Sequence, residues 1–134
     1  MSLFNLFAIS GSAVSAQSKR LNVVASNLAN ADAVAGPDGQ PFKARQIHFE
    51  PQPLAGSEVA GVRVSGILET QAPPRRVHEP GNPLADAEGY VTHSNVNAVD
   101  EMVNMISASR SYQNNVEVMN TARQLLAKTL QMGQ

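Results

Sequence analysis

Apolar residues recur at alternating steps of three and four near both ends of the chain. In the first thirty residues this seam runs through Phe7, Ser10, Val14, Gln17, Leu21, Val24 and Leu28. Such a heptad pattern, on a segment without proline, predicts a helix from about Ser2 to Ala29. Small side chains on its other faces, such as Ala8 and Gly11, favour the close approach of neighbouring helices.

The last forty residues carry a second, longer seam. Asn97 is a good N-cap, and Asp100 and Glu101 place negative charge where the helix dipole favours it. No proline follows, and no glycine before Gly133, so we predict a single helix of about 35 residues. The seam steps through Met105, Ser109, Tyr112, Val116, Met119, Arg123, Leu126 and Leu130, and Val99, Val103 and Ile106 widen it near its start.

The segment between the seams contains turns and short alternating runs. Gly36-Pro37-Asp38-Gly39 predicts a turn, because proline presets φ and glycine tolerates positive φ. Alternating apolar residues predict strands at Ile47 and Phe49, at Val62, Val64, Ile67 and Leu68, and at Tyr90 and Val91. We read the prolines at 73, 74, 80 and 83 as interruptions. The prediction is a small β-rich module that is not stable alone.

Together these patterns predict a mainly α fold. Residues 1–30 form the N-terminal helix, residues 31–94 an inserted β-rich or loop module, and residues 95–134 the C-terminal helix. We expect the two helices to pair as a coiled-coil-like hairpin. One intramolecular partner does not cover all the apolar surface of a helix this long, so packing against further molecules is expected.

Composition and charge exclude several classes of function. Ten basic and eleven acidic residues give a net charge of −1, which offers no electrostatic footprint for nucleic acid or an anionic membrane. The absence of cysteine removes disulfides, thiolate catalysis and Cys-based zinc sites. The first positive side chain is Lys19, so the pattern of a cleaved signal peptide is missing. No apolar run approaches the roughly 20 residues of a membrane-spanning helix.

Candidate chemistry is sparse. His48, His78 and His93 lie far apart without the spacing of a metal motif, and we interpret them as surface or turn residues. Asp86 and Glu88 do not supply the six to eight oxygen ligands that calcium takes, so a solvated loop is expected there. No serine lies in a nucleophile elbow. We therefore predict no catalytic residue, cofactor or metal, and a protein that is not an enzyme.

Several runs resemble the flagellar rod, hook and hook-associated axial proteins. They are Ala25–Ala31 with the Gly36–Phe42 turn, Glu79–Val91, Asn95–Asn97, and Glu101–Asn104 with Ser107–Glu117. The resemblance covers nearly the whole chain, and the short length is similar to that of proximal rod members. The signature residues that we single out are Ser26, Asn27, Asn30, Gly36, Gly39, Pro80, Gly81, Asn82, Pro83, Gly89 and Tyr90.

The resemblance implies a structural subunit of the proximal rod of the bacterial flagellum. Such proteins are exported through the flagellar type III apparatus without a cleaved signal and assemble helically around a channel in the periplasm-spanning rod. Their terminal helices form an inner tube. The implied partners are copies of the chain, the rod proteins FlgB, FlgF, FlgG and FliE, and the export apparatus.

Helix contacts within and between subunits are then expected on the two seams. The expected contact residues are Phe7, Val14, Leu21, Val24, Leu28, Val103, Ile106, Tyr112, Val116, Met119, Leu126 and Leu130. Two other functions stay open at this point. One is a stand-alone coiled-coil binding module or export adaptor, and the other is a small enzyme that uses the middle loops.

Overall fold

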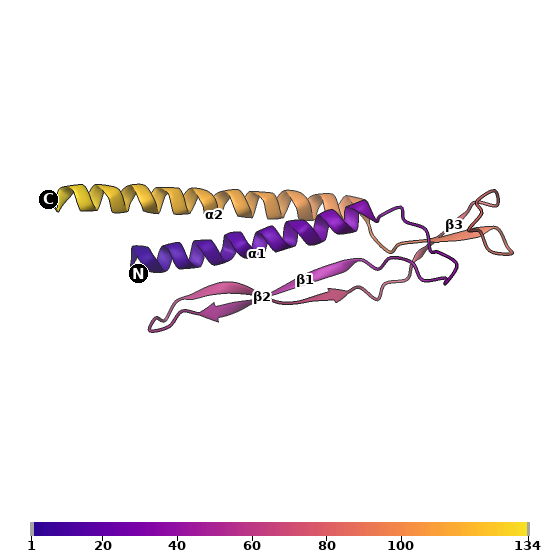
Figure 1. The fold of residues 1–134 in the computed structure, drawn as a ribbon, viewed down its shortest axis with the longest axis horizontal. Coiled ribbons are helices and arrows are strands. Elements are labelled where there is room, and N and C mark those ends of the chain that lie inside the picture. The colour runs from indigo at the N-terminus through magenta and orange to yellow at the C-terminus, as the bar shows by residue number, and fades with distance from the viewer. Residues whose placement is uncertain (1, 134) are drawn as a thin grey trace. The chain divides into compact units, whose positions relative to one another are not determined.

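A computed structural model describes residues 2–133 of the chain (Figure 1). Its elements are α1 (Leu3–Ala29), β1 (Arg45–Pro53), β2 (Ala60–Glu69), β3 (Arg75–His78), β4 (Tyr90–His93) and α2 (Ala98–Met132). The two predicted terminal helices and the strands between them are confirmed. The architecture is mixed α and β rather than mainly α, because the inserted segment forms four strands.

Both helices begin at a polar cap. The side-chain oxygen of Asn97 accepts hydrogen bonds from the backbone N–H groups of Val99, at 3.1 Å, and Asp100, at 3.2 Å. These bonds satisfy donors that have no partner inside the helix, and they confirm the predicted N-cap. At the start of α1, the hydroxyl of Ser2 accepts a bond of 3.2 Å from the backbone N–H of Asn5.

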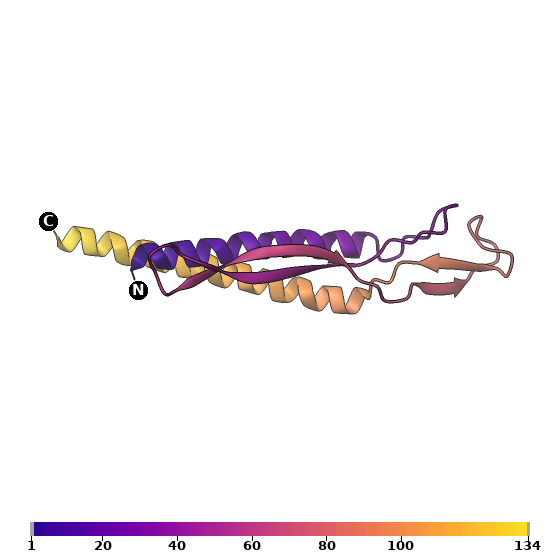
Figure 2. The ribbon, with the colours of Figure 1, turned by 90° about the horizontal axis from the view of Figure 1, so that it is seen from below.

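The strands form two separate two-stranded sheets, β1 with β2 and β3 with β4. In Figure 2, β3 and β4 lie side by side and run in opposite directions. Arg75 pairs with His93 and His78 with Tyr90 across this ladder, and an isolated bridge joins Val34 to His93. The sequence did not predict β3. It contains only one apolar residue, Val77, and it follows two prolines, so its extended form depends on pairing with β4.

The described residues form two compact units. The first contains the chain up to Leu21, Ile47–Gly66 and the residues from Ile106 on. Here the hydroxyl of Ser12 donates to the carbonyl of Ile9, at 2.7 Å, and accepts from the N–H of Val62, at 3.0 Å. Gly61 comes so close that an added Cβ would lie 2.6 Å from this hydroxyl oxygen. The β1–β2 hairpin thus approaches α1 closely at Gly61, because glycine has no side chain, and it is bonded to α1 through Val62.

The second unit contains Asn22–Gln46 and Ile67–Met105. Its small apolar core consists of Ala31, Ala44 and Val96, with Phe42 and Ala98 packed against them. The predicted turn is confirmed, since the N–H of Gly39 donates to the carbonyl of Gly36 at 2.9 Å and Gly39 has φ of 72°. Across residues 2–133, neither helix combines the length and the apolar character that crossing a membrane requires.

Candidate functional site

The surface of α2 is mostly uncovered. Of its 35 residues only Ala108 and Ala122 are buried. A helix of this length in a self-contained domain normally buries an apolar stripe. Here the large apolar side chains exposed to solvent include Val99, Met102, Val103, Ile106, Val118, Leu125, Leu130 and Met132. The helix therefore presents the kind of apolar surface that marks an interaction site.

The predicted contact residues differ in exposure along the chain. In α1, Val24 is buried and Phe7, Val14, Leu21 and Leu28 are half-buried. In α2, Tyr112, Val116, Met119 and Leu126 are half-buried, whereas Val103, Ile106 and Leu130 are exposed by 60%, 55% and 63%. The single chain thus leaves several of these positions open to solvent, so covering them needs a further molecule.

Asn27 ties the end of α1 to the start of β1. Its side-chain amide donates to the carbonyl of Arg45 at 2.8 Å, and its side-chain oxygen accepts from the N–H of Arg45 at 2.9 Å. The side chain therefore pairs with one backbone residue as a neighbouring strand would. Asn27 is 1% exposed, so these bonds satisfy polar groups that water does not reach.

Asn95, in the segment before α2, also bonds to backbone groups next to β1 and β2. Its side-chain oxygen accepts from the N–H of Ala44 at 2.7 Å, and its amide donates to the carbonyls of Thr70, at 3.0 Å, and Ala72, at 2.9 Å. The N–H of Thr70 also donates to the carbonyl of Ala44 at 2.7 Å. Asn27 and Asn95 thus hold both chain segments at the base of the β1–β2 hairpin, and we name these two residues the asparagine clamp.

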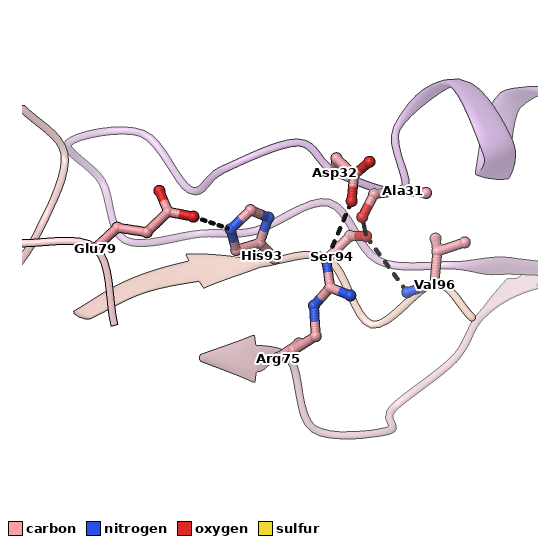
Figure 3. A network of polar contacts seen from close by, with 7 residues as sticks. All are labelled: Ala31, Asp32, Arg75, Glu79, His93, Ser94 and Val96. Carbon is pink, nitrogen blue, oxygen red and sulfur yellow. Dashed lines mark hydrogen bonds and ion pairs between the residues drawn. The ribbon is translucent and has the colours of Figure 1, made fainter. Parts of the chain in front are cut away.

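Ser94 precedes Asn95 in the sequence and bonds to the segment that follows α1 (Figure 3). Its hydroxyl donates to the carbonyl of Ala31 at 2.7 Å and lies 3.4 Å from the N–H of Val96, which donates to it. The backbone N–H of Ser94 donates to Ala33, and that of Ala35 donates to Thr92. Residues 33–35 therefore run beside β4 and connect the end of α1 with the segment that leads into α2.

Asp86 organises the loop between β3 and β4. Its carboxylate accepts from the N–H groups of Glu88 and Tyr90, both at 2.9 Å, and from the guanidinium of Arg76 at 2.7 Å. Gly89 completes this loop with φ of 85°. The N–H of Tyr90, followed by that of Glu88 and by Arg76, lowers the pKa of Asp86 below its ordinary 3.8, against a smaller opposing effect of desolvation. Asp86 and Glu88 are exposed as expected of a solvated loop, and Asp86 in addition bonds to the backbone of that loop.

His93 departs from the surface position expected of it. It is 8% exposed, and neither ring nitrogen has a hydrogen-bond partner among the described residues. The carboxylate of Glu79 points at its Nε2 from 3.7 Å, while the neighbouring Arg75 pairs with Asp32 at 3.2 Å (Figure 3). The prediction failed because pairing of β4 with both β3 and residues 33–35 encloses this histidine. His48 and His78 are exposed as expected.

The signature residues fall into three places. Ser26 and Asn30 lie at the end of α1, where the Asn30 amide donates to the carbonyl of Ser26 at 2.9 Å, and Asn27 is in the clamp. Gly36, Gly39, Pro83 and Tyr90 line one shared groove of the second unit. In the β3–β4 loop, the Asn82 amide donates to Glu79 at 3.1 Å. Pro80 and Gly81 are exposed in that loop, and Gly89 is buried.

Comparison with known proteins gives one consistent result. The model of the flagella basal body rod protein family matches residues 7–37, and that of the flagellar basal body rod FlgEFG protein C-terminal family matches residues 87–132. The flagellar basal-body rod protein FlgC of Yersinia enterocolitica is 61% identical over 134 residues, and that of Salmonella typhimurium is 59% identical over 134 residues. Both alignments cover 100% of each chain.

The chain belongs to the FlgC family of flagellar basal-body rod proteins. Relatives extend to Buchnera aphidicola subsp. Schizaphis graminum, whose FlgC is 48% identical over 136 residues. As a FlgC family member, the chain is a structural protein of the flagellar basal-body rod and not an enzyme. Within residues 2–133, no three His, Asp or Glu side chains gather in a way that suits a metal ion.

Within this FlgC family chain, sequence reasoning missed two parts of the site. Asn95 and Ser94 precede the N-cap of α2, and they were not singled out although Asn95 belongs to a run resembling axial proteins. The backbone groups that Asn95 and the Ser94 hydroxyl bond to in Ala31, Ala44, Thr70 and Ala72 are distant in the sequence, so no local pattern indicates these bonds. Ser12 was also missed, since nothing local shows that Gly61 lies against it.

Proposed function

We propose that the chain forms part of the proximal rod and assembles helically through its terminal helices around a central export channel. In this proposal residues 1–30 and 95–134 form the inner tube, and residues 31–94 form an outer layer. The contacts between successive subunits are heterologous, so a patch on one copy meets a different patch on the next. Because the rotation does not close, a tube grows.

The observation that carries this proposal is the uncovered surface of α2. Isolated helices gain little stability from propensity alone, and most helical stability in proteins comes from packing. A helix of 35 residues with two buried positions lacks most of that packing in the single chain. Neighbouring subunits in a tube would supply it, which fits the membership of the FlgC family.

We also propose that α1 and α2 pair along their seams as a coiled-coil-like hairpin. Leu6 of α1 lines a groove together with Asn114, Glu117, Val118 and Thr121 of α2, all in the first unit. The half-buried state of the α1 seam and of the central α2 seam supports the same pairing. The seams would then be shared between the intramolecular pair and the contacts with neighbouring subunits.

The proposed partners and route follow from the family resemblance. The partners are copies of the chain, FlgB, FlgF, FlgG and FliE, and the flagellar type III export apparatus. Export would proceed without a cleaved signal, and the assembled protein would lie in the periplasm-spanning rod. Neither nucleic acid nor direct membrane insertion has a part in this proposal.

A pair of seam substitutions tests the proposal. Leu21→Asp or Val116→Asp places a charge at a half-buried seam position, where an unpaired carboxylate costs several kcal/mol once neighbours exclude water. We expect either variant to be exported but not incorporated into rods. In cells whose only copy is the variant, swimming should be lost and no hook or filament should form. Export is followed by immunoblotting of the periplasmic and extracellular fractions.

The matched control is Gln113→Asp, which adds the same charge at an exposed position of α2. This variant should retain swimming within about twofold, since surface substitutions usually change stability by under ~0.5 kcal/mol. Rods of normal length built from Leu21→Asp or Val116→Asp subunits would contradict the proposed role of the seams.

A further inference from the structure

The strand β1 carries two prolines on a free edge. Among residues 2–133, β1 pairs with β2 alone, so the other side of β1 is an edge of the sheet. Exposed Pro51 and Pro53 lie on β1, two residues apart. Proline has no backbone N–H, so it is unsuited to a position where a neighbouring strand needs a donor. The direction of these two positions therefore decides what the edge can bind.

The even-numbered positions of β1 face β2. The N–H of Leu54, just beyond β1, donates to the carbonyl of Val59 at 3.2 Å. The carbonyl of His48 accepts from the hydroxyl of Ser65 on β2 at 3.1 Å. Successive residues of an antiparallel strand direct their backbone groups to opposite edges. The odd-numbered positions therefore point to the free edge, and in the first unit these are Ile47, Phe49, Pro51 and Pro53.

The free edge of β1 has usable donors only in its middle. Ile47 and Phe49 have backbone N–H groups, whereas the two prolines have none. In the second unit, Arg45 is the outward position nearest the start of the strand. Both of its backbone groups are bonded to the side chain of Asn27, at 2.8 and 2.9 Å. The edge is thus occupied at its start and without donors at its end.

The opposite edge of the hairpin is limited in another way. The N–H of Val62 in β2 donates to the hydroxyl of Ser12 in α1 at 3.0 Å. This N–H therefore points away from β1, and the helix occupies the place that a further strand would need. The edge of β2 is covered at this point, while the edge of β1 depends on its own residues.

We propose that Pro51 and Pro53 form a device that prevents the hairpin of one copy from pairing with the hairpin of a second copy. An unpaired strand edge is a template for pairing with another chain, and proline is one of the residues that block such edges. β1 has nine residues, which is longer than most strands, so an unblocked edge would offer a long template. The inference concerns a contact that the chain avoids, and it does not rest on the proposed assembly.

The position of the prolines weakens each antiparallel alignment of two β1 edges. Residues directly opposite each other in a hydrogen-bonded pair exchange two bonds. In one alignment Phe49 faces Pro51 of the second copy. Ile47 then faces Pro53, so each pair has a single donor. In the alignment where Ile47 faces Phe49, the next outward position is Arg45, whose groups are already bonded within the chain. Contacts between two strands with so few bonds are marginal in water.

The double variant Pro51→Thr with Pro53→Thr tests the device, because threonine restores both N–H groups and favours strands. We expect the purified full chain with both changes to self-associate through β1 as its concentration rises. Sedimentation velocity measures the size of the particles. Hydrogen exchange resolved by residue locates the contact, and the amides of Ile47 and Phe49 should exchange at least about tenfold more slowly than in the parent chain.

The matched control is Gln52→Thr, at an exposed position between the two prolines. It adds the same side chain, but its N–H faces β2, so no donor is added to the free edge. We expect this variant to match the parent chain in size and in the exchange of Ile47 and Phe49. Equal self-association of Gln52→Thr and the double variant would overturn the inference, since strand propensity rather than the restored donors would then cause it.

The single variants Pro51→Thr and Pro53→Thr give a measurement that stays useful if the double variant precipitates. Each restores one donor, so each should self-associate at a concentration between those of the double variant and the parent chain. Circular dichroism spectra like that of the parent chain show that the variants are folded. Folded variants that keep the parent's size and the parent's exchange at Ile47 and Phe49 would overturn the inference.

Discussion

At the scale of single residues, short polar side chains do much of the structural work in this chain. Asn27 and Asn95 use their amides as substitutes for strand neighbours, and Asp86 uses its carboxylate as the centre of a loop. Each is a residue type that bonds readily to nearby backbone. Of these three residues, Asn27 and Asp86 lie in or beside elements with a strong local pattern, whereas Asn95 lies in the irregular segment before α2.

Asp86 gives a pH-dependent prediction. Its pKa in the folded chain is below 3.8, so the ionised carboxylate contributes stability that is present above that pH and is lost as the pH falls through the folded pKa. Asp86→Asn should therefore lower the thermal midpoint at pH 7, and the difference from the parent chain should shrink progressively below about pH 4. Thermal unfolding followed by circular dichroism measures both curves.

The charge-matched control for this experiment is Glu88→Gln, which removes one negative charge from the same loop. Its side chain is exposed, and its backbone N–H still donates to Asp86. The same pH dependence in both variants would mean that general charge effects, rather than the bonds to Asp86, govern the loop.

At the scale of elements, the sequence predicted both helices to within a residue or two and placed three of the four strands. These elements have local signals: seams of period 3.5, an N-cap and alternating apolar residues. β3 has no such local signal, because it is extended only through its pairing with β4, which lies further along the sequence. For the same reason the burial of His93 and the clamp of Asn95 were not predictable, since both depend on which strands meet.

The contact between α1 and the β1–β2 hairpin gives a prediction at this scale. In Gly61→Ala the new Cβ would lie 2.6 Å from the Ser12 hydroxyl, which is held by Ile9 and Val62. Relieving the clash means breaking these bonds or moving the strand, at a cost of about 1–3 kcal/mol. Urea unfolding, or the rate of limited proteolysis in the hairpin, should show the loss.

Gly66→Ala is the matched control on the same strand. No atom lies within 4 Å of its added Cβ, and its φ is not positive. Since glycine in a strand loses more conformational freedom on folding than alanine does, this variant should be neutral or more stable by up to about 1 kcal/mol. Equal losses in both variants would show that the approach of Ser12 does not limit the hairpin.

At the scale of the whole molecule, buried residues are distributed unevenly along the chain. The second unit has a small core and the asparagine clamp, whereas α2 has two buried residues along its entire length. Regions with few buried apolar contacts open at low free energy. We therefore expect the single chain to be better ordered around the clamp than along α2 toward Met132.

This contrast predicts how the dilute monomer behaves. We expect the amides of α2 toward Met132 to exchange with deuterium much faster than those of Ala44 and Arg45, which bond to the clamp. Circular dichroism should show less helix than α1 and α2 together contain, with helix increasing on polymerisation. A monomer with uniformly slow exchange and a single cooperative transition would argue against a helix completed by neighbours.

The asparagine clamp also bears on how related chains diverge. Its bonds to the hairpin all end on backbone N–H and C=O groups, of Arg45, Ala44, Thr70 and Ala72, and none ends on a side chain. Every residue type except proline offers both groups. The clamp therefore does not depend on which side chains the hairpin carries, so substitutions on the exposed positions of β1 and β2 can leave this attachment unchanged.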